Sequence, residues 1–279
     1  MSDNQSVLYK LHAAAREAEK IVMRIYGEAD FGTELKGPND PVTRADKQAN
    51  ALLLEHLGRD FPSVPIVAEE SHESAYANFD KERAALFVDP IDGTREFIDR
   101  NGEFAIMIGL AENARPIAAV ILCPALGETY LGAEGVGAFV IDARGTRSPI
   151  RVGNVATLAQ SRCAVSRHHR SEGTDARLKA LAVKELVAVG SAGIKGVRIA
   201  TGELDIFAHP TSGCMKLWDT CAPDAIVRAA GGILTDAVGQ AFNYRGAVSQ
   251  GRGMLAANPS LHAEAVRRLT AFEQSAHCR

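Results

Sequence analysis

The sequence predicts a mixed α+β / α/β fold made of two subdomains, and three observations support this class. Apolar residues recur at helical spacing through much of the first 60 residues, and short apolar segments separated by turn residues follow from 84 to 141. From about residue 160, strand-like and helix-like segments alternate. Because the chain shows no linker, repeat or low-complexity segment, we expect residues 1–160 and 161–279 to form two subdomains that share one cleft.

The first quarter of the chain is predicted to be mainly helical. Its apolar residues lie three and four positions apart, and glycine or Phe-Pro steps interrupt the pattern. The expected elements are, in order, a helix over 6–27, a polar, glycine-rich stretch to Asp40, a helix that Thr43 and Asp46 open and that runs through Leu57, and a short strand over 65–68.

The central region is predicted to be a largely antiparallel sheet, because its apolar runs are short and turn residues separate them. The expected strands are 84–88, 104–111, 117–123, 129–132 and 137–141. The second half is expected to continue with strand 162–166, helix 174–182, strand 185–190, helix 192–202, strand 204–209, helix 219–231 and strand 233–237.

Composition excludes several classes of protein. A net charge of −3 over 279 residues is not the basic surplus of a nucleic-acid binder. No segment reaches the roughly 18 apolar residues of a membrane span, and the opening MSDNQSVLYK lacks the order of a secretory signal. The five cysteines are odd in number and have no CxxC spacing, which favours free thiols in a cytoplasmic protein.

The segment DPIDGTREF, residues 89–97, offers two kinds of ligand side by side. Asp89 and Asp92 supply carboxylate oxygens at the end of an apolar strand, and Pro90 stiffens the bend between them. Gly93 allows close approach to the backbone, and Thr94 can begin a helix whose free N–H groups favour an anion. Taken alone, the two aspartates could also be turn and cap residues.

Other carboxylates stand at the ends of predicted elements, where the active sites of layered α/β folds collect. They are Asp46, Glu69, Glu70 and Asp219. Carboxylates gathered in one cleft repel one another, so they require a cation. The candidate ligands are all oxygen, which favours Mg²⁺, or Mn²⁺ as a substitute, over zinc. About two or three ions would suit a two-metal phosphatase, in which metals offset the charge of a phosphate ester.

Four ordered segments carry a resemblance to a known family. VTRAD (42–46), VAEES (67–71), DPIDGT (89–94) and WDTCAPDAIVRAAGG (218–232) resemble the inositol monophosphatase-like superfamily of Mg²⁺-dependent, lithium-sensitive phosphatases. The resemblance extends over nearly the whole chain. It implies a layered αβαβα sandwich with a metal-binding first subdomain and a second subdomain that completes the active site.

Within that superfamily, the chain is similar to the 3′(2′),5′-bisphosphate nucleotidases. The similarity lies in DPIDGTREFIDRNGEFAIMIGL (89–110), SRHH (166–169), GSAGIK (190–195) and LWDTCAP (217–223). It implies hydrolysis of the 3′-phosphate of adenosine 3′,5′-bisphosphate to AMP and phosphate by metal-activated water, a step linked to sulfur metabolism. The alternatives are an inositol or sugar monophosphatase on the same scaffold and a catalytically silent metal or nucleotide sensor.

The resemblance also implies roles for individual residues. The metal ligands would be Glu69, Asp89, Asp92, Asp219 and the Ile91 carbonyl, with Glu70 behind them. Asp46 and Thr94 would orient the attacking water. The substrate would meet the amides of Gly93 and Thr94, the side chain of His169 near the base, and Lys195 near the second phosphate.

Two positions depart from the pattern of the relatives. Some relatives have a Ser-Ser pair where this chain has Ser191-Ala192, and some have an arginine near the position of His209. Both positions concern the nucleotide. We further expect Trp218 to pack beneath the metal site, and Asp205 to face the cleft or cap a turn. The expected partner is a small phosphate ester, with no nucleic-acid polymer or membrane span, for a monomer or homodimer.

Overall fold

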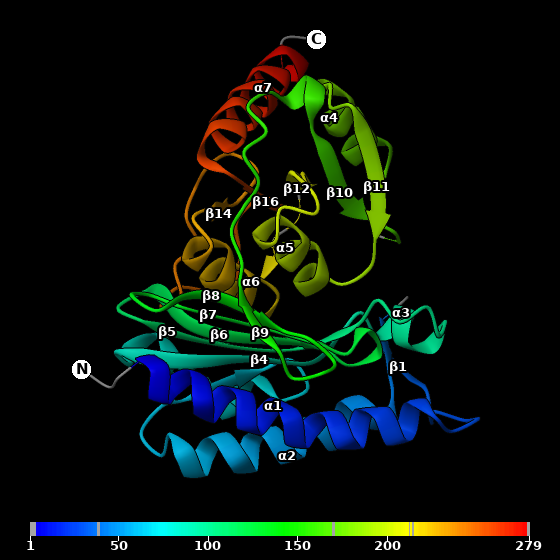
Figure 1. The fold of residues 1–279 in the computed structure, drawn as a ribbon, viewed down its shortest axis with the longest axis vertical. Helices are drawn as coiled ribbons and strands as arrows, with labels where there is room; N and C mark the ends of the chain where they lie inside the picture. Colours follow the sequence, from blue (N-terminus) through cyan, green and yellow to red (C-terminus); the bar gives the residue numbers. More distant parts are fainter. Residues whose placement is uncertain (1–3, 38–39, 169–170, 212, 214, 278–279) are drawn as a thin grey trace.

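The computed structural model describes residues 4–37, 40–168, 171–211, 213 and 215–277. Figure 1 shows five layers, in the predicted αβαβα order. Helices α1 (Asn4–Tyr26) and α2 (Arg44–Asp60) form one outer layer. A seven-stranded sheet follows, then helices α5 (Ala192–Ala200) and α6 (Leu217–Ala229), then a five-stranded sheet. Helices α4 (Glu172–Leu181) and α7 (Pro259–His277) form the other outer layer.

The outer helices α1 and α2 form because their apolar residues share one face. Leu8, Leu11 and Val22 of α1 are buried against the sheet and α2. At the start of α2, the Thr43 side chain accepts from Ala45 N, while the Asp46 carboxylate accepts from Thr43 N. The first acidic site residue is therefore also part of a helix cap.

The larger sheet carries most of the first half of the chain. In order across the sheet, its strands are β3 (Ile66–Ala68), β4 (Ala84–Asp92), β5 (Ala105–Glu112), β6 (Arg115–Cys123), β7 (Glu128–Ala133), β8 (Gly137–Ile141) and β9 (Arg147–Pro149). Only the β3–β4 pair among these is parallel. The prediction of a largely antiparallel sheet is confirmed, although β9 was not predicted.

Two local predictions for this half are wrong. The strand expected to close at Asp89 continues as β4 through Asp92, because the register shifts between these residues and Asp92 pairs with Ala105. A β-bulge lets the strand pass Pro90, which has no N–H to donate. The polar, glycine-rich stretch before Asp40, for which no strand was predicted, contains β1 (Glu34–Gly37), which pairs with β2 (Asp40–Val42).

The smaller sheet holds the second half. Its order is β11 (Glu185–Val189), β10 (Arg162–Ser166), β12 (Ile206–His209), β16 (Met254–Ala257) and β14 (Ile233–Thr235). Strand β10 is parallel to both neighbours, and β16 is antiparallel to both of its own. The predicted alternation of strands and helices is confirmed as far as β14, whereas β16 and α7 were not predicted.

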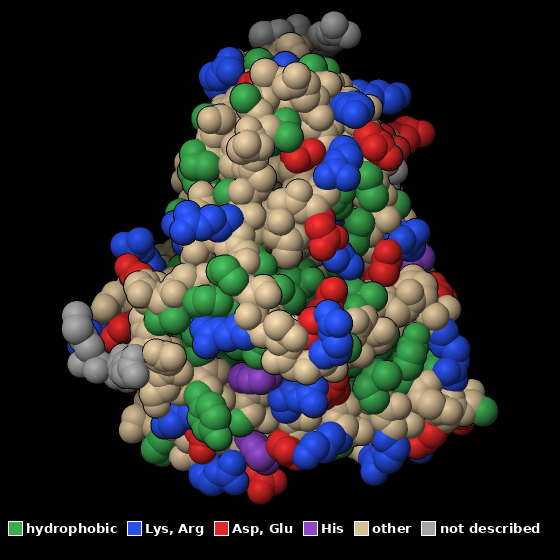
Figure 2. Space-filling model, viewed as in Figure 1, with side chains coloured by type: hydrophobic (Ala, Val, Ile, Leu, Met, Phe, Trp, Pro, Cys, Tyr) green, Lys and Arg blue, Asp and Glu red, His purple; other side chains and the backbone are tan. Residues whose placement is uncertain are grey.

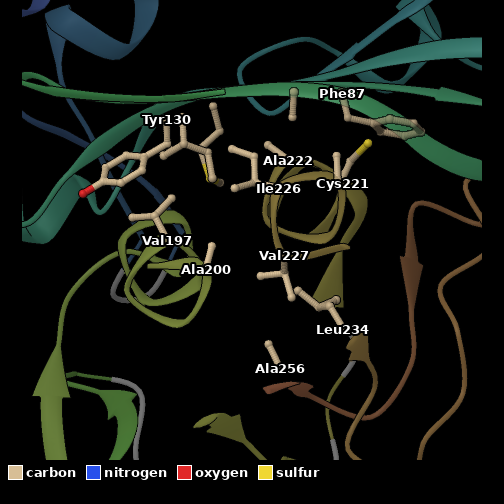
Figure 3. Packing of buried hydrophobic residues seen from close by; sticks show 14 of the residues in the cluster. Phe87, Tyr130, Val197, Ala200, Cys221, Ala222, Ile226, Val227, Leu234 and Ala256 are labelled. Carbon is tan, nitrogen blue, oxygen red and sulfur yellow. The ribbon is translucent and has the colours of Figure 1, made fainter. Parts of the chain in front are cut away.

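Helix α6 lies between the two sheets and packs on both, as Figure 3 shows. Ile226 faces the larger sheet, and Val227 faces Leu234 of the smaller one. Two glycines allow this close packing: a Cβ on Gly109 would lie 2.7 Å from Cys221 Sγ, and one on Gly132 would lie 2.8 Å from Ile226 Cα. The division near residue 160 separates the sheets but stays a prediction.

The remaining elements are short. They are α3 (Thr94–Ile98), the 3₁₀ turns Glu73–Ala75, Phe79–Lys81, Pro124–Leu126 and Leu158–Gln160, and the pair β13 (Met215–Lys216) and β15 (Ser249–Gln250). Across the described residues, every helix is too short or too polar to span a bilayer. On the face in Figure 2, acidic and basic side chains are interspersed.

Candidate active site

The end of β4 delivers the two aspartates of the DPIDGT segment and turns directly into α3. Gly93 stands between them and the helix with φ +96°, a conformation that side chains with a Cβ rarely adopt. A Cβ at this position would also lie 3.0 Å from the Glu103 carbonyl oxygen. The glycine is thus required by both backbone conformation and space.

Five carboxylates from four distant segments lie within electrostatic reach of one another. We call them the acid cluster: Asp46, Glu69, Asp89, Asp92 and Asp219. Burial, followed by repulsion from the other four carboxylates, raises the pKa of Asp89 well above its ordinary value. Burial and repulsion from Glu69 and Asp92 likewise raise the pKa of Asp219. The cluster therefore disfavours its own full ionisation, and a cation would relieve it.

Asp46 and Thr94 form the part of the site expected to handle water. Thr94 Oγ1 donates to Asp46 Oδ1 at 3.1 Å and lies 3.2 Å from the Ile91 carbonyl oxygen. Asp46 Oδ2 also accepts from Thr43 N and Thr43 Oγ1. Burial raises the pKa of Asp46 to about 6, although the hydrogen bonds from Thr43 and Thr94 oppose the shift. A carboxyl that titrates near neutral pH can accept a proton at physiological pH.

The other aspartates are held by donors from the protein. Asp89 Oδ1 accepts from Ile91 N at 3.0 Å, and Asp92 Oδ2 accepts from Ser191 Oγ and from Gly193 N at 2.7 Å. With the side chains placed in this way, no three Asp, Glu, His or Cys groups among the described residues surround a common point as ligands of one ion. Asp89 and Asp92 thus repel each other electrostatically, while each accepts hydrogen bonds from different protein donors.

A cationic side chain already serves as counter-charge at one edge of the cluster. Lys36 Nζ, on β1, lies 2.9 Å from Glu69 Oε1 and 2.6 Å from Glu70 Oε1. Burial by itself would lower the pKa of Lys36, but attraction by the two glutamates outweighs it and raises the pKa. The acid cluster thus fits a cation, and its all-oxygen donor set fits Mg²⁺.

A pocket of about 170 Å³ lies against the acid cluster. It is lined by Asp92, Gly93, Glu96, Ser166, Ser191, Ala192, Lys195, Phe207, His209, Met215 and Asp219. Lys195 is 5% exposed, and its Nζ donates to the Val189 carbonyl oxygen at 3.2 Å. Burial lowers the pKa of Lys195, and the nearby Asp92 and Glu96 oppose that shift. The pocket is therefore lined both by carboxylates and by a buried amine that lies within their electrostatic reach.

Most of the residues predicted for the site come together. The acid cluster is contiguous, Asp46 contacts Thr94, and Gly93 and Lys195 line one pocket. His169 lies outside the described residues, as does Cys214. Trp218 is buried in the core, and its expected place beneath the metal site stays a prediction. Of the two alternatives for Asp205, the structure supports a structural role, since its carboxylate accepts from Arg162 N at 2.7 Å.

Sequence reasoning missed three contributors to the site. They are Lys36, Glu96 and the hydrogen bond that the Ser191 hydroxyl donates to Asp92, 99 positions away. Ser191 carried one usable signal, since a serine before a helical pattern is a helix cap, and it does cap α5 through Ile194 N. Lys36 carried no signal, because the sequence of a polar stretch does not distinguish a lysine that pairs with a distant carboxylate from one that is exposed to solvent.

Comparison with known proteins establishes the family of the chain. The sequence model of the Inositol monophosphatase family matches residues 3–275. The chain belongs to this family. Solved structures agree on the fold: extragenic suppressor protein suhB from Bartonella henselae has a TM-score of 0.80 at 27% identity and covers 95% of this chain and 98% of its own. CysQ from Bacteroides thetaiotaomicron has a TM-score of 0.74 at 27% identity, covering 91% and 97%.

Curated relatives are named bisphosphate nucleotidases. The 3′(2′),5′-bisphosphate nucleotidase CysQ of Escherichia coli K12 is 32% identical over 238 residues, which cover 82% of this chain and 90% of that protein. The human 3′(2′),5′-bisphosphate nucleotidase 1 is 29% identical and covers 88% of both chains. The family and fold predicted from the sequence are confirmed, and with them the prediction that the chain is a phosphatase.

Proposed function

We propose that this phosphatase hydrolyses the 3′-phosphate of adenosine 3′,5′-bisphosphate, with AMP and phosphate as products and Mg²⁺ as cofactor. The observation that carries the proposal is the pocket that the buried amine of Lys195 lines together with Asp92 and Asp219. A substrate with two phosphates needs a cationic partner away from the hydrolytic centre, and Lys195 supplies one. The names of the curated relatives support the same substrate.

The residues proposed to hold Mg²⁺ are Glu69, Asp89, Asp92, Asp219 and the Ile91 carbonyl, with Glu70 behind them. When bound, magnesium would offset the negative charge of the phosphate ester and so let an oxygen nucleophile approach the phosphorus. Glu69 would have to exchange its ion pair with Lys36 for this role. The all-oxygen donor set supports magnesium over zinc.

The proposed proton acceptor for the attacking water is Asp46. Thr94 donates its hydroxyl proton to Asp46 Oδ1, so the Thr94 oxygen keeps lone pairs with which to accept a hydrogen bond from water. Asp46, with a pKa of about 6, can then take the proton that the water releases. The backbone N–H groups of Gly93 and Thr94 are the proposed donors to the scissile phosphate, and His169 stays a proposed contact for the base.

A second candidate is an inositol or sugar monophosphatase. It is favoured by a solved neighbour described as an IMPase from Thermotoga maritima, with a TM-score of 0.78 at 26% identity. That candidate gives the buried amine of Lys195 no second phosphate to bind. A catalytically silent sensor is the weakest candidate, because it has no use for the contact between Asp46 and Thr94, the two residues proposed to orient the attacking water.

One assay separates the three candidates. Phosphate release is measured for the full chain with adenosine 3′,5′-bisphosphate, inositol 1-phosphate and fructose 1,6-bisphosphate, each with Mg²⁺ and with EDTA. We expect the highest kcat/KM for the nucleotide, 5′-AMP as its product, and no turnover in EDTA. A preference for inositol 1-phosphate would favour the second candidate, and no phosphate release from any ester would favour the third.

The same proposal includes the cellular context that the family resemblance implies. We propose a cytoplasmic monomer or homodimer that removes a nucleotide product of sulfate activation and that lithium inhibits. Millimolar LiCl in the phosphate-release assay should lower the rate, whereas an equal concentration of NaCl should not. Equal rates in the two salts would contradict the lithium proposal.

A further inference from the structure

Glu96 is a buried carboxylate in the pocket that none of the proposed roles uses. It lies on α3, two residues after Thr94, and is 6% exposed. Its side chain lines the same pocket as Gly93 and Lys195. A Cβ built on Gly93 would lie 3.3 Å from Glu96 Oε2, so one carboxylate oxygen lies directly beside the proposed phosphate-binding backbone.

The protein holds this carboxylate in place from two sides. Gly190 lies against it, since a Cβ there would lie 2.4 Å from Glu96 Cγ and 2.7 Å from Oε1. The amide of Gly190 is in turn fixed by Glu103, which accepts from it at 2.7 Å and also pairs with Arg167. His168 Nε2 lies 3.6 Å from Glu96 Oε1. Only a glycine at 190 leaves the space that Glu96 occupies.

An ionised carboxylate at this place repels phosphate, but it can accept a hydrogen bond from a hydroxyl group of the substrate. Because Gly93, Glu96 and Lys195 line one pocket and Glu96 lies beside Gly93, a substrate whose scissile phosphate contacts the Gly93 backbone brings its neighbouring carbon atoms near Glu96. In a ribose 3′-phosphate, the hydroxyl on the neighbouring carbon lies close to the phosphate oxygens. That 2′-hydroxyl can donate to an acceptor that stands beside the phosphate site.

We propose that Glu96 is a specificity residue that accepts a hydrogen bond from the sugar hydroxyl next to the scissile phosphate, and so selects ribonucleotide over deoxyribonucleotide bisphosphates. The inference rests on the proposed function and adds the sugar class of the substrate. A hydrogen bond to a charged group corresponds to about a tenfold to hundredfold preference in kcat/KM.

The test compares adenosine 3′,5′-bisphosphate with 2′-deoxyadenosine 3′,5′-bisphosphate for the wild-type protein, Glu96→Ala and Glu96→Gln. The wild type should prefer the ribonucleotide by about tenfold or more. Glu96→Ala should bring the ratio of the two kcat/KM values close to one, and Glu96→Gln, which keeps a neutral acceptor, should retain part of the preference. The ratio is insensitive to a general loss of active protein, because both substrates are measured on one preparation.

Asp99→Asn is the matched control. Asp99 Oδ2 lies 3.8 Å from the same His168 nitrogen, but its side chain is 56% exposed and does not line the pocket. This variant should keep the wild-type ratio. The role of Glu96 would be overturned, and the proposed function left standing, by either of two results. The wild type could hydrolyse both nucleotides equally well, or Glu96→Ala could leave the ratio of the two kcat/KM values unchanged. A wild type inactive on both would overturn the proposed function itself, and this inference with it.

Discussion

Two parts of the site are built on different principles: the acid cluster, called here the charged end, and the buried amine of Lys195, called here the amine end. At one end, the acid cluster gathers like charges, and burial together with mutual repulsion raises the pKa values of Asp89 and Asp219. At the other end, a single amine, Lys195, lies buried beside the Phe207 ring, 5.4 Å from its centroid. Repulsion among several carboxylates thus dominates the first end. The second end holds a single positive charge, which the surrounding side chains keep buried.

The two ends are joined through Asp92. Its carboxylate belongs to the acid cluster but accepts from Ser191 Oγ and Gly193 N at the start of α5, the helix that carries Lys195. A change at Asp92 would therefore disturb both ends. Substitutions that separate the two must lie elsewhere, at Asp89, Asp46 and Lys36 on one side and at Lys195 on the other.

The largest expected effect is at the charged end. Asp89→Asn should lower kcat by about a thousandfold or more, because ion-mediated stabilisation of a phosphate transition state amounts to several kcal/mol. The variant should fold at least as stably without metal, since it removes one charge from a repelling set. Steady-state kinetics and thermal melting in EDTA measure the two effects. A large fall in the metal-free Tm would show that Asp89 supports the fold instead.

The pH dependence of stability tests the same end without catalysis. The pKa of Asp46 is raised from 3.8 to about 6, so the folded protein binds this proton more tightly than the unfolded chain. The stabilising contribution of this proton to the free energy of unfolding is complete below about pH 4 and is lost as pH rises to about 6, a change of roughly 3 kcal/mol at most. Urea unfolding of metal-free wild type and Asp46→Asn across this range should show a steeper decline for the wild type. Parallel curves would contradict the raised pKa.

The amine end should respond selectively. Lys195→Ala should lower kcat/KM for adenosine 3′,5′-bisphosphate by about tenfold to a hundredfold, because a charge-assisted contact to the second phosphate is lost. The rate with inositol 1-phosphate should change much less. Lys179→Ala removes an exposed lysine of α4 and serves as the control for net charge. Equal losses on both substrates would mean that Lys195 does not recognise a second phosphate.

The smallest effect is expected for the lysine at the edge of the acid cluster. Lys36→Ala should lower the metal-free free energy of unfolding by about 1 kcal/mol, because Glu69 and Glu70 lose their counter-charge. Thermal melting with and without Mg²⁺ should then show a larger gain from Mg²⁺ than in the wild type. Lys47→Ala removes a more exposed pair with Glu34 and is the control. If Mg²⁺ raised the Tm of Lys36→Ala and of Lys47→Ala by the same amount, Lys36 would not be the counter-charge of the two glutamates.

Sequence patterns predicted the helices and strands closely where the signal was local. The helix predicted over 6–27 is α1, Asn4–Tyr26, and the strand predicted over 162–166 is β10. Sequence patterns failed where the pairing of strands decides the structure, as in the bulge that extends β4 to Asp92 and in the β1–β2 pair. A strand that continues past a proline depends on a partner strand, which periodicity cannot reveal.

The candidate site divides in the same way. Strand-end carboxylates were found because their residue type and position are local properties, whereas Lys36, Ser191 and Glu96 were missed. Glu96 follows the recognised motif by two residues, but its significance depends on Gly190 and Lys195, which belong to the other half of the chain. Its position beside them could not be inferred from spacing.

By itself, the order of residues determined that acidic side chains end several elements, that these elements alternate as they do, and that the chain belongs to a phosphatase family. Periodicity, strand-end position and short motifs all express preferences of neighbouring residues, so they can be read along the chain. Tertiary structure alone decided which donor each carboxylate meets and that one carboxylate, Glu96, lines a pocket together with Gly93 and a buried amine. Such contacts join residues about a hundred positions apart, and only the packing of α3 and α5 around one pocket brings them together.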